Sequence, residues 1–224
     1  MSYFSRVTLK PQRLMSEKLA PLVCNDGYKT HQALWRLFDD DPNAERDFLF
    51  RRDDLFQGVR YFVVSQRQPD DNTGLWQIER KPYSPKVKAG QTLAFSLRVN
   101  PVVKRKGEDG KSRRHDVVMD EKRRTRQEDG TSKKHVMEIA QEAGSAWLAR
   151  RSMSCGFSVN PSAVRIDSYH QHKSFKSGQK IAYSTLDMNG VLTVVEPAVF
   201  MRSLKKGIGP AKAFGCGLML VRRT

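Results

Sequence analysis

The order of strand-like and helix-like segments constrains the fold of this 224-residue chain more than any other feature. One short run of aromatic and β-branched residues is followed by a helical pattern and then by three further strand-like runs. The helical pattern rests on Leu34, Leu37 and Phe38, which recur at the i, i+3, i+4 spacing of one helix face. The expected strands span residues 3–10, 47–52, 59–66 and 75–81, and the expected helix spans residues 28–38.

A second set of segments follows in a similar order. Leu93, Phe95 and Leu97 alternate with small or charged residues and predict a half-buried strand. A helical pattern with Ile139 and Trp147 comes next, then several strand-like runs, a short helix and a last strand. The expected strands span residues 92–99, 157–159, 163–169, 180–187, 191–195 and 217–222, and the expected helices span residues 136–150 and 196–205.

Two α+β halves account for this order better than one parallel, doubly wound sheet. Pro82 and Pro85 punctuate the chain between the two sets, so we expect one domain over residues 1–87 and a second over residues 88–224. Within the second domain, residues 104–134 hold 12 Lys or Arg and 7 Asp or Glu but few large apolar residues. This composition predicts a mobile basic insertion and not a core element.

Charge indicates the kind of partner. The chain has 40 Lys and Arg against 24 Asp and Glu, a formal net charge of +16, and residues 202–224 contain six basic and no acidic residues. A Ser-Gly pair at 177–178 predicts a hairpin tip that presents Lys176 and Lys180 together, with Lys173 earlier in the same basic segment. Phosphate contacts by such a hairpin would release counterions. We therefore expect a nucleic acid partner, with RNA favoured over DNA; the alternative is a solvated positive surface.

A glycine-rich segment precedes the last strand, with four glycines in eleven residues. It has neither the GxxxxGK spacing of a P-loop nor a Rossmann fingerprint. Glycines let a backbone approach a phosphate closely, but a tight helix-to-strand turn needs them equally, and the spacing leaves both interpretations open. The glycines are Gly207, Gly209, Gly215 and Gly217, and the lysines around them are Lys205, Lys206 and Lys212.

One histidine stands out as a catalytic candidate. In the expected helix, Tyr28 lies three residues before His31 and Trp35 lies four residues after it, so the three side chains share one face. A histidine beside a tyrosine suits proton transfer near neutral pH, as in RNA strand cleavage by the substrate's own 2′-hydroxyl. From the residues alone, a histidine packed at the edge of the core is the favoured alternative.

The sequence offers little support for a metal site, a disulfide framework or a membrane-targeting segment. His170 and His172 form an HxH pair without a Cys or carboxylate at supporting spacing, so we expect no metal, no cofactor and no small-molecule substrate. Three cysteines without a CxxC pair predict no disulfide framework and a reducing compartment. The N-terminus lacks the apolar core of a signal peptide, and the longest nearly apolar stretch, 213–221, is too short for a bilayer. We expect a cytoplasmic protein.

Three parts of the chain together resemble a known family. They are YKTHQALWRLF at 28–38 with RDFLF at 46–50, FSLRVNPV at 95–102, and GIGPAKAFGCGL at 207–218. The chain closely resembles the CasE family, the CRISPR repeat-processing endoribonucleases of Cascade (type I-E) systems. The similarity extends from Tyr3 to Val221, and its most specific part is the glycine-rich C-terminal segment.

The resemblance implies an α+β fold of two tandem ferredoxin-like (RRM-like) domains, with antiparallel sheets and helices on one face. It implies metal-independent cleavage of precursor CRISPR RNA at the 3′ base of the repeat stem-loop, giving a 5′-hydroxyl and a 2′,3′-cyclic phosphate. It also implies that the enzyme keeps the processed hairpin and joins the other Cascade subunits. The RNP aromatic motif of true RRMs is missing, so base stacking on a sheet is not implied.

The resemblance also assigns site residues. The family's histidine falls on His31 and its tyrosine on Tyr28, which overturns the preference for a packing histidine. Its basic hairpin falls around Lys173 to Lys180, and its phosphate-facing turn falls on Gly207 to Gly217. The sequence does not say whether His31 is the general acid or the general base.

Other functions fit parts of the same pattern. A non-catalytic subunit that binds or scaffolds the RNA hairpin needs the same basic surface without any chemistry at His31. A general or ribosome-associated RNA-binding protein would show no preference for a CRISPR repeat over another hairpin. A metal-dependent nuclease is the most distant alternative, because no paired-carboxylate pattern stands out.

Overall fold

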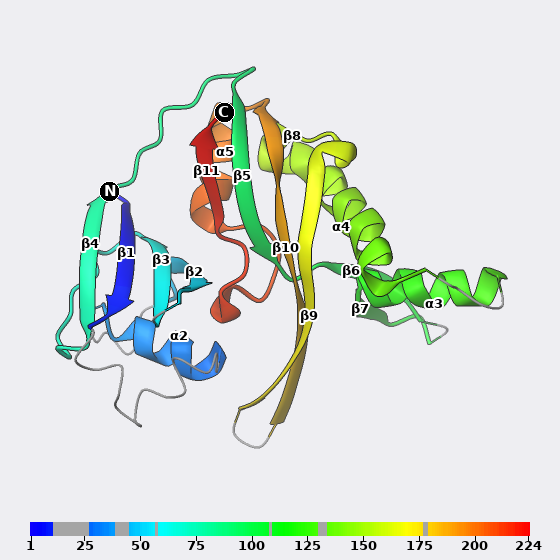
Figure 1. Ribbon diagram of the computed structural model, residues 1–224, viewed down its shortest axis with the longest axis horizontal. Coiled ribbons are helices and arrows are strands. Elements are labelled where there is room, and N and C mark those ends of the chain that lie inside the picture. The colour runs from blue at the N-terminus through cyan, green and yellow to red at the C-terminus, as the bar shows by residue number, and fades with distance from the viewer. Residues whose placement is uncertain (11–26, 39–44, 57, 108, 130–133, 177–178) are drawn as a thin grey trace.

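We describe the protein from a computed structural model. The structure describes residues 1–10, 27–38, 45–56, 58–107, 109–129, 134–176 and 179–224. It is a mixed α+β architecture in which two larger antiparallel sheets stand beside each other, with helices packed against them (Figure 1). Within these ranges, no helix is long and apolar enough to cross a membrane.

The first sheet is built from β1 (Tyr3–Leu9), β2 (Phe48–Asp54), β3 (Val59–Ser65) and β4 (Trp76–Pro82), and helix α2 spans Gly27–Trp35. The strands are antiparallel in the order β2-β3-β1-β4, which is the strand order of a ferredoxin-like domain. Residues 66–75, which join β3 to β4, contain no helix, as the sequence predicts. The five expected elements of the first half are therefore confirmed, with their ends shifted by up to three residues.

One face of the first sheet packs against α2. Val7, Phe50 and Tyr61 project from three neighbouring strands and are almost fully buried, as is Leu34 of α2. Burial of side chains of this size stabilises the fold by roughly 1.5–3 kcal/mol each, before the entropy cost of ordering them. The apolar side chains that recur at every second residue in the strands and at every third or fourth residue in α2 therefore pack together in one core.

The second sheet repeats the ferredoxin-like order. Its strands are β5 (Thr92–Val99), β8 (Phe157–Ser158), β9 (Val164–Lys176), β10 (Gln179–Val194) and β11 (Met219–Arg223). They run in the order β11-β5-β10, with β9 and the short β8 both paired to the far side of β10. Helices α4 (Val136–Ser152) and α5 (Pro197–Lys206) pack on one face. The expectation of two tandem ferredoxin-like domains is confirmed, and the predicted boundary at residue 87, between β4 and β5, stays a prediction.

The strands β9 and β10 are longer than the sequence suggested. The expectation of separate strands at 180–187 and 191–195 is wrong, because Met188, Asn189 and Gly190 continue the ladder between them. A β-carbon at Gly190 would lie 2.5 Å from the carbonyl oxygen of Ala163. Glycine is needed at this point for close approach and not for a turn.

The basic insertion is also ordered differently from the prediction. The expectation that residues 104–134 lack a core element is wrong: they contribute to a hairpin of β6 (Val102–Lys106) and β7 (Ser112–Asp116) and to helix α3 (Val117–Asp129). Val117 and Val118 are buried in the core of the second half. The charge-rich composition hid these elements, because only two apolar residues anchor the first turn of α3. Residues 108 and 130–133 lie outside the described residues.

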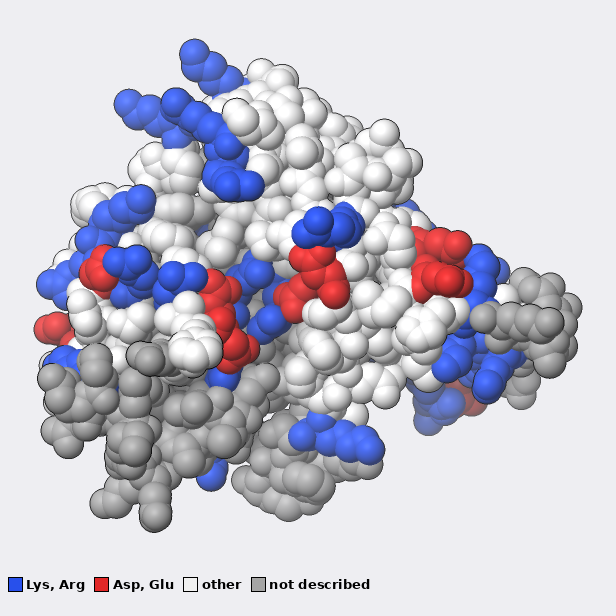
Figure 2. All heavy atoms as spheres, in the orientation of Figure 1, with Lys and Arg blue, Asp and Glu red and all other residues white. Residues whose placement is uncertain are grey.

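The two sheets meet along a seam. The Arg51 guanidinium on β2 donates a 2.9 Å hydrogen bond to the Ser96 hydroxyl on β5, and Leu49 packs against Leu218 from the segment before β11. In the second sheet, Arg98 forms a bidentate pair with Asp187 at 2.8 and 2.9 Å. Figure 2 shows basic and acidic side chains side by side over the first sheet and where it meets the second.

Candidate functional site

The glycine-rich segment 207–217 lies at the seam, against the edge strand β2 (Figure 1). It contains the short 3₁₀ helix η5 (Lys212–Phe214), which lies against α2. Two backbone hydrogen bonds hold the segment in place. Ile208 N–H donates to Gly217 O at 2.9 Å within the segment, and Gly217 N–H donates to Arg98 O of β5 at 2.7 Å. The segment is therefore a tied loop between the two halves.

The glycines of this segment serve the fold directly. All four have positive φ, between 77° and 95°. At Gly207 a β-carbon would come within 2.9 Å of the Leu49 side chain, and at Gly215 it would lie 3.1 Å from the Phe50 ring. The turn interpretation of these glycines is therefore supported. The N–H groups of Gly207, Ile208, Phe214, Gly215 and Gly217 already donate to backbone carbonyls, so a phosphate contact in this segment would have to come from its remaining amides or from Lys212.

The candidate histidine lies where α2 meets the edge of the first sheet. The His31 ring is half-buried among aromatic rings: its centroid is 5.6 Å from Trp35, 5.8 Å from Phe48 and 6.5 Å from Phe50. Its Nδ1 atom is shielded from solvent. Phe50 in turn lies beneath Gly215, so one ring connects His31 to the glycine-rich segment.

The start of α2 touches the second half of the chain. A β-carbon at Gly27 would lie 3.0 Å from Phe214 of η5 and 3.1 Å from the Tyr183 hydroxyl of β10. Tyr28 is the next residue of this helix, and its side chain lies outside the described part of the structure. The structure thus places the backbone of Tyr28 and the ring of His31 at one end of the seam.

A stack of three rings borders this end of the seam. The Phe214 and Tyr183 rings are stacked with centroids 4.5 Å apart, and Tyr183 and His172 are stacked at 4.8 Å. The Nε2 atom of His172 lies 2.9 Å from the Thr185 hydroxyl. Burial lowers the pKa of His172, and the charges of His170 and Arg98 add to this, so neutral pH favours the uncharged ring.

Positive charge gathers beside η5. Partial burial lowers the pKa of the Lys212 ammonium, and the nearby charges of Arg46 and Lys206 lower it further. Crowded cations of this kind gain from a bound anion, because the anion removes their mutual repulsion. Lys205 and Lys206 are exposed in the last turn of α5 and line a hollow with Asp47.

The predicted basic hairpin is the end of the β9–β10 pair, which projects beyond the body of the protein in Figure 1. Lys173 is exposed on β9. Lys176 pairs with Gln179 in the register, and Lys180 pairs with Phe175, so both lie on the hairpin arms. The side chains of Lys176 and Lys180, and the tip at 177–178, lie outside the described residues.

Several residues of this neighbourhood were missed from the sequence. Tyr183 and Phe214 come from segments that only the tertiary fold brings to α2, so no local pattern marks them. Arg46 had a signal, as a basic residue directly before a predicted strand. His170 and His172 were weighed only as metal ligands; within the described residues no three His, Cys, Asp or Glu side chains are grouped to hold a metal ion.

Curated relatives match most of the chain. The CRISPR system Cascade subunit CasE of Escherichia coli K12 is 27% identical over 201 residues, which is 87% of this chain and 90% of that protein. The CRISPR-associated endoribonuclease Cse3 of Thermus thermophilus is 30% identical over 151 residues, 63% of this chain and 60% of that protein.

Solved structures share the fold over its full length. Cse3 bound to a 19-nucleotide RNA superposes with a TM-score of 0.70 at 24% identity, covering 98% of both chains. Cas6e of E. coli K12 superposes with a TM-score of 0.57 at 23% identity, covering 99% of this chain and all of that one. A family model described as "CRISPR associated protein" matches residues 2–223. The chain therefore belongs to this family of CRISPR-associated proteins.

Proposed function

We propose that this chain is a metal-independent endoribonuclease that cleaves precursor CRISPR RNA at the 3′ base of the repeat stem-loop. It then retains the processed hairpin as a subunit of a Cascade complex in the cytoplasm. The observation that carries the proposal is the position of His31, on α2 at the seam between two ferredoxin-like halves. The names of its relatives, an endoribonuclease and a Cascade subunit, support it.

The chemistry needs little beyond proton transfer. The substrate's 2′-hydroxyl oxygen attacks the adjacent phosphorus while its proton passes to a general base. The bond from phosphorus to the 5′-oxygen breaks, and a general acid protonates that oxygen. The products are a 2′,3′-cyclic phosphate and a 5′-hydroxyl. His31 takes one of these two proton-transfer roles, and Tyr28 positions the 2′-hydroxyl or shares the transfer.

Charge stabilisation is the second requirement, because the pentavalent transition state carries more negative charge than the phosphodiester. Lys212, with Arg46 and Lys206 close to it, supplies fixed positive charge beside α2. These cations repel one another without an anion, so binding of the RNA backbone relieves a cost that the protein already bears. Lys173, Lys176 and Lys180 on the β9–β10 hairpin would hold stem phosphates.

A single-turnover assay tests the proposal. The protein is held in excess over the end-labelled repeat hairpin of its host in EDTA, with an unrelated hairpin of equal length as a substrate control. Wild type is compared with His31→Ala and with Gln32→Ala, an exposed neighbour on α2. We expect one cut on the repeat hairpin only, slowed at least about 100-fold in His31→Ala with unchanged affinity.

Other outcomes would select other functions. Tight binding of the repeat without cleavage by wild type would favour a non-catalytic hairpin-binding subunit. Cleavage that EDTA abolishes would favour a metal-dependent nuclease. Equal slowing in Gln32→Ala would mean that α2 is merely disturbed and that His31 has no special role.

A further inference from the structure

Two hollows lie side by side where β6, β7, α4 and the glycine-rich segment meet. One encloses about 460 Å³ and the other about 540 Å³, and they share Val102, Arg114 and Pro210. Together they form one groove, and its basic side chains are Lys104, Arg114, Arg150, Arg151 and Lys173. We call it the basic groove.

In the part of the chain that the structure describes, none of the five cations of the basic groove makes an ion pair. Lys104 and Arg114 even lie directly opposite each other in the β6–β7 register. Like charges in this position repel, so the pair weakens the hairpin unless an anion binds between or above them.

The other face of the same hairpin is different. Arg105 and Arg113 are the neighbouring cross-strand pair, and each has a carboxylate: Arg105 binds Asp120 at 2.8 Å, and Arg113 binds Asp109 at 2.6 Å. Successive residues of a strand point to opposite faces. Neutralised cations therefore lie on one face of the hairpin, and unneutralised cations lie on the other.

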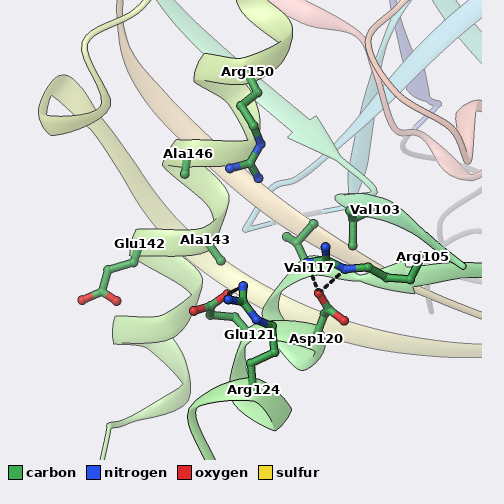
Figure 3. A pocket seen from close by; sticks show the side chains of 10 residues that line it. All are labelled: Val103, Arg105, Val117, Asp120, Glu121, Arg124, Glu142, Ala143, Ala146 and Arg150. Atoms are coloured by element: carbon green, nitrogen blue, oxygen red, sulfur yellow. Dashed lines mark hydrogen bonds and ion pairs between the residues drawn. The ribbon is translucent and has the colours of Figure 1, made fainter. Parts of the chain in front are cut away.

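The hollow between α3, α4 and β6 differs from the basic groove because carboxylates line it beside the cations (Figure 3). Its charged lining holds both signs, with Arg105 bound to Asp120 and Arg124 bound to Glu121. Arg150 lines this hollow as well as the basic groove. A polyanion gains little there, because carboxylates stand beside the cations. In the basic groove Asp116 is the one carboxylate among the lining residues, and both its oxygens accept hydrogen bonds, from Tyr169 and from the first amides of α3.

The basic groove begins beside the candidate catalytic helix. His172 and Tyr183 line its first hollow, and the Tyr183 hydroxyl adjoins Gly27, the first residue of α2. The second hollow continues to Trp147 and Arg151 of α4. The Arg151 guanidinium is held in place, stacked 4.5 Å over the Trp147 ring and donating to Val102 O at 3.4 Å.

We propose that the basic groove holds the phosphates of a single-stranded RNA segment that continues from the cleaved stem. This inference rests on the function proposed above. Each hollow has the volume of a small-ligand site, which suits the nucleotides of a single strand. Five cations, against the single carboxylate of Asp116 among the lining residues, provide the phosphate contacts.

Binding measurements test the groove separately from cleavage. In a His31→Ala background, which keeps the RNA intact, Arg114→Gln with Arg150→Gln is compared with Arg113→Gln with Arg124→Gln. The control pair removes the same charge from neutralised arginines of β7 and α3. Three RNAs are titrated at several salt concentrations: the repeat stem-loop alone, and the stem-loop with a single-stranded extension at its 5′ or at its 3′ end.

We expect the groove variant to weaken binding of one extended RNA about tenfold and to reduce its salt slope by about 1.4, or 0.7 for each lost phosphate contact. Binding of the bare stem-loop should stay unchanged, and the extension that responds identifies which strand occupies the groove. An equal loss for all three RNAs, or for the control pair, would overturn the proposal. Unchanged RNA binding together with failure to assemble with other Cascade subunits would also overturn it, in favour of a protein interface. Cleavage by the wild type decides the proposed function independently of each of these results.

Discussion

The ring of Phe214 lies on the ring of Tyr183, with centroids 4.5 Å apart and planes inclined by 30°. Phe214 belongs to η5 in the glycine-rich segment, and Tyr183 belongs to β10. Both side chains lie within 3.1 Å of the position that a β-carbon of Gly27 would occupy at the start of α2. Three segments that are far apart in the sequence thus meet at the start of the candidate catalytic helix.

Removal of the Phe214 ring should therefore reduce cleavage more than binding. In Phe214→Ala, α2 and η5 lose a common contact, and the displacement of a catalytic group by about 1 Å can slow a reaction about 100-fold. We expect a rate loss of at least tenfold in single-turnover cleavage, with less than threefold change in RNA affinity. Phe214→Tyr keeps the stack and should retain most of the rate; a wild-type rate in Phe214→Ala would contradict the role of the stack.

Gly27→Ala tests the same contact from the helix side. The added methyl group would lie 3.0 Å from Phe214 and 3.1 Å from the Tyr183 hydroxyl, so one of these neighbours must shift by a few tenths of an ångström. Alanine favours helix by up to about 1 kcal/mol over glycine, so the free energy of unfolding should not fall. We expect cleavage to slow several-fold without loss of thermal stability.

The double variant supplies the control. If Gly27→Ala acts by pressing on the Phe214 ring, its effect should disappear when the ring is absent. Gly27→Ala with Phe214→Ala should then cleave no more slowly than Phe214→Ala alone. Additive losses in the double variant would show that the two positions act separately.

The ion pair of Arg98 with Asp187 should make the stability of the fold depend on pH. Burial acts to raise the pKa of Asp187, but the hydrogen bonds and charge of Arg98, with Ser168 and Arg51, outweigh it and hold this pKa below its usual range. The ion pair therefore stabilises the fold above about pH 3.9, the unfolded value, and this stability is lost as pH falls through the folded pKa.

Urea denaturation measures this contribution. At pH 7, Asp187→Asn should lower the free energy of unfolding by about 2–3 kcal/mol, because it leaves Arg98 largely buried without its charge partner. Asp167→Asn breaks an exposed pair with Arg165 and should leave the free energy of unfolding close to that of wild type. The difference between wild type and Asp187→Asn should shrink at strongly acidic pH, and a constant difference would show that charge is not its cause.

Local pattern predicted most of the elements, and the reasons are visible in particular strands. The strand predicted at 92–99 is β5 residue for residue, because its alternating Leu93, Phe95 and Leu97 face one core. The same patterning located α2. It failed for β10, which continues through residues 188–190 between the two predicted strands, with Gly190 packed closely against Ala163.

The candidate site was only partly predictable. His31 and the glycine-rich segment carry motifs, so a resemblance found them. The rings of Tyr183 and Phe214 and the pair of Arg98 with Asp187 depend on contacts between distant segments; the last two residues are 89 positions apart. No local periodicity encodes such contacts, and a charged residue in a strand looks the same whether it faces solvent or a seam.

The start of α3 is bound to the core of the second half, although the composition of residues 104–134 predicted no core element there. Asp116 accepts hydrogen bonds from the amides of Val118 at 2.8 Å and Met119 at 2.9 Å, which caps the start of α3. The Tyr169 hydroxyl donates to the second Asp116 oxygen at 3.0 Å and ties this cap to β9. Val118 is fully buried, whereas Met119 is 41% exposed. The first turn of α3 is therefore part of the core of the second half.

Adjacent substitutions separate the core interpretation from that of a solvated insertion. Val118→Ala removes two buried methyl groups and should lower the free energy of unfolding by about 2 kcal/mol in urea denaturation. Met119→Ala, one residue further along the same helix, should change it by less than about 0.5 kcal/mol. If both variants unfold like wild type, α3 unfolds separately from the second half and contributes nothing to its stability. If only Val118→Ala is destabilised, the basic face of the β6–β7 hairpin is fixed to the core and can present its cations in a constant geometry.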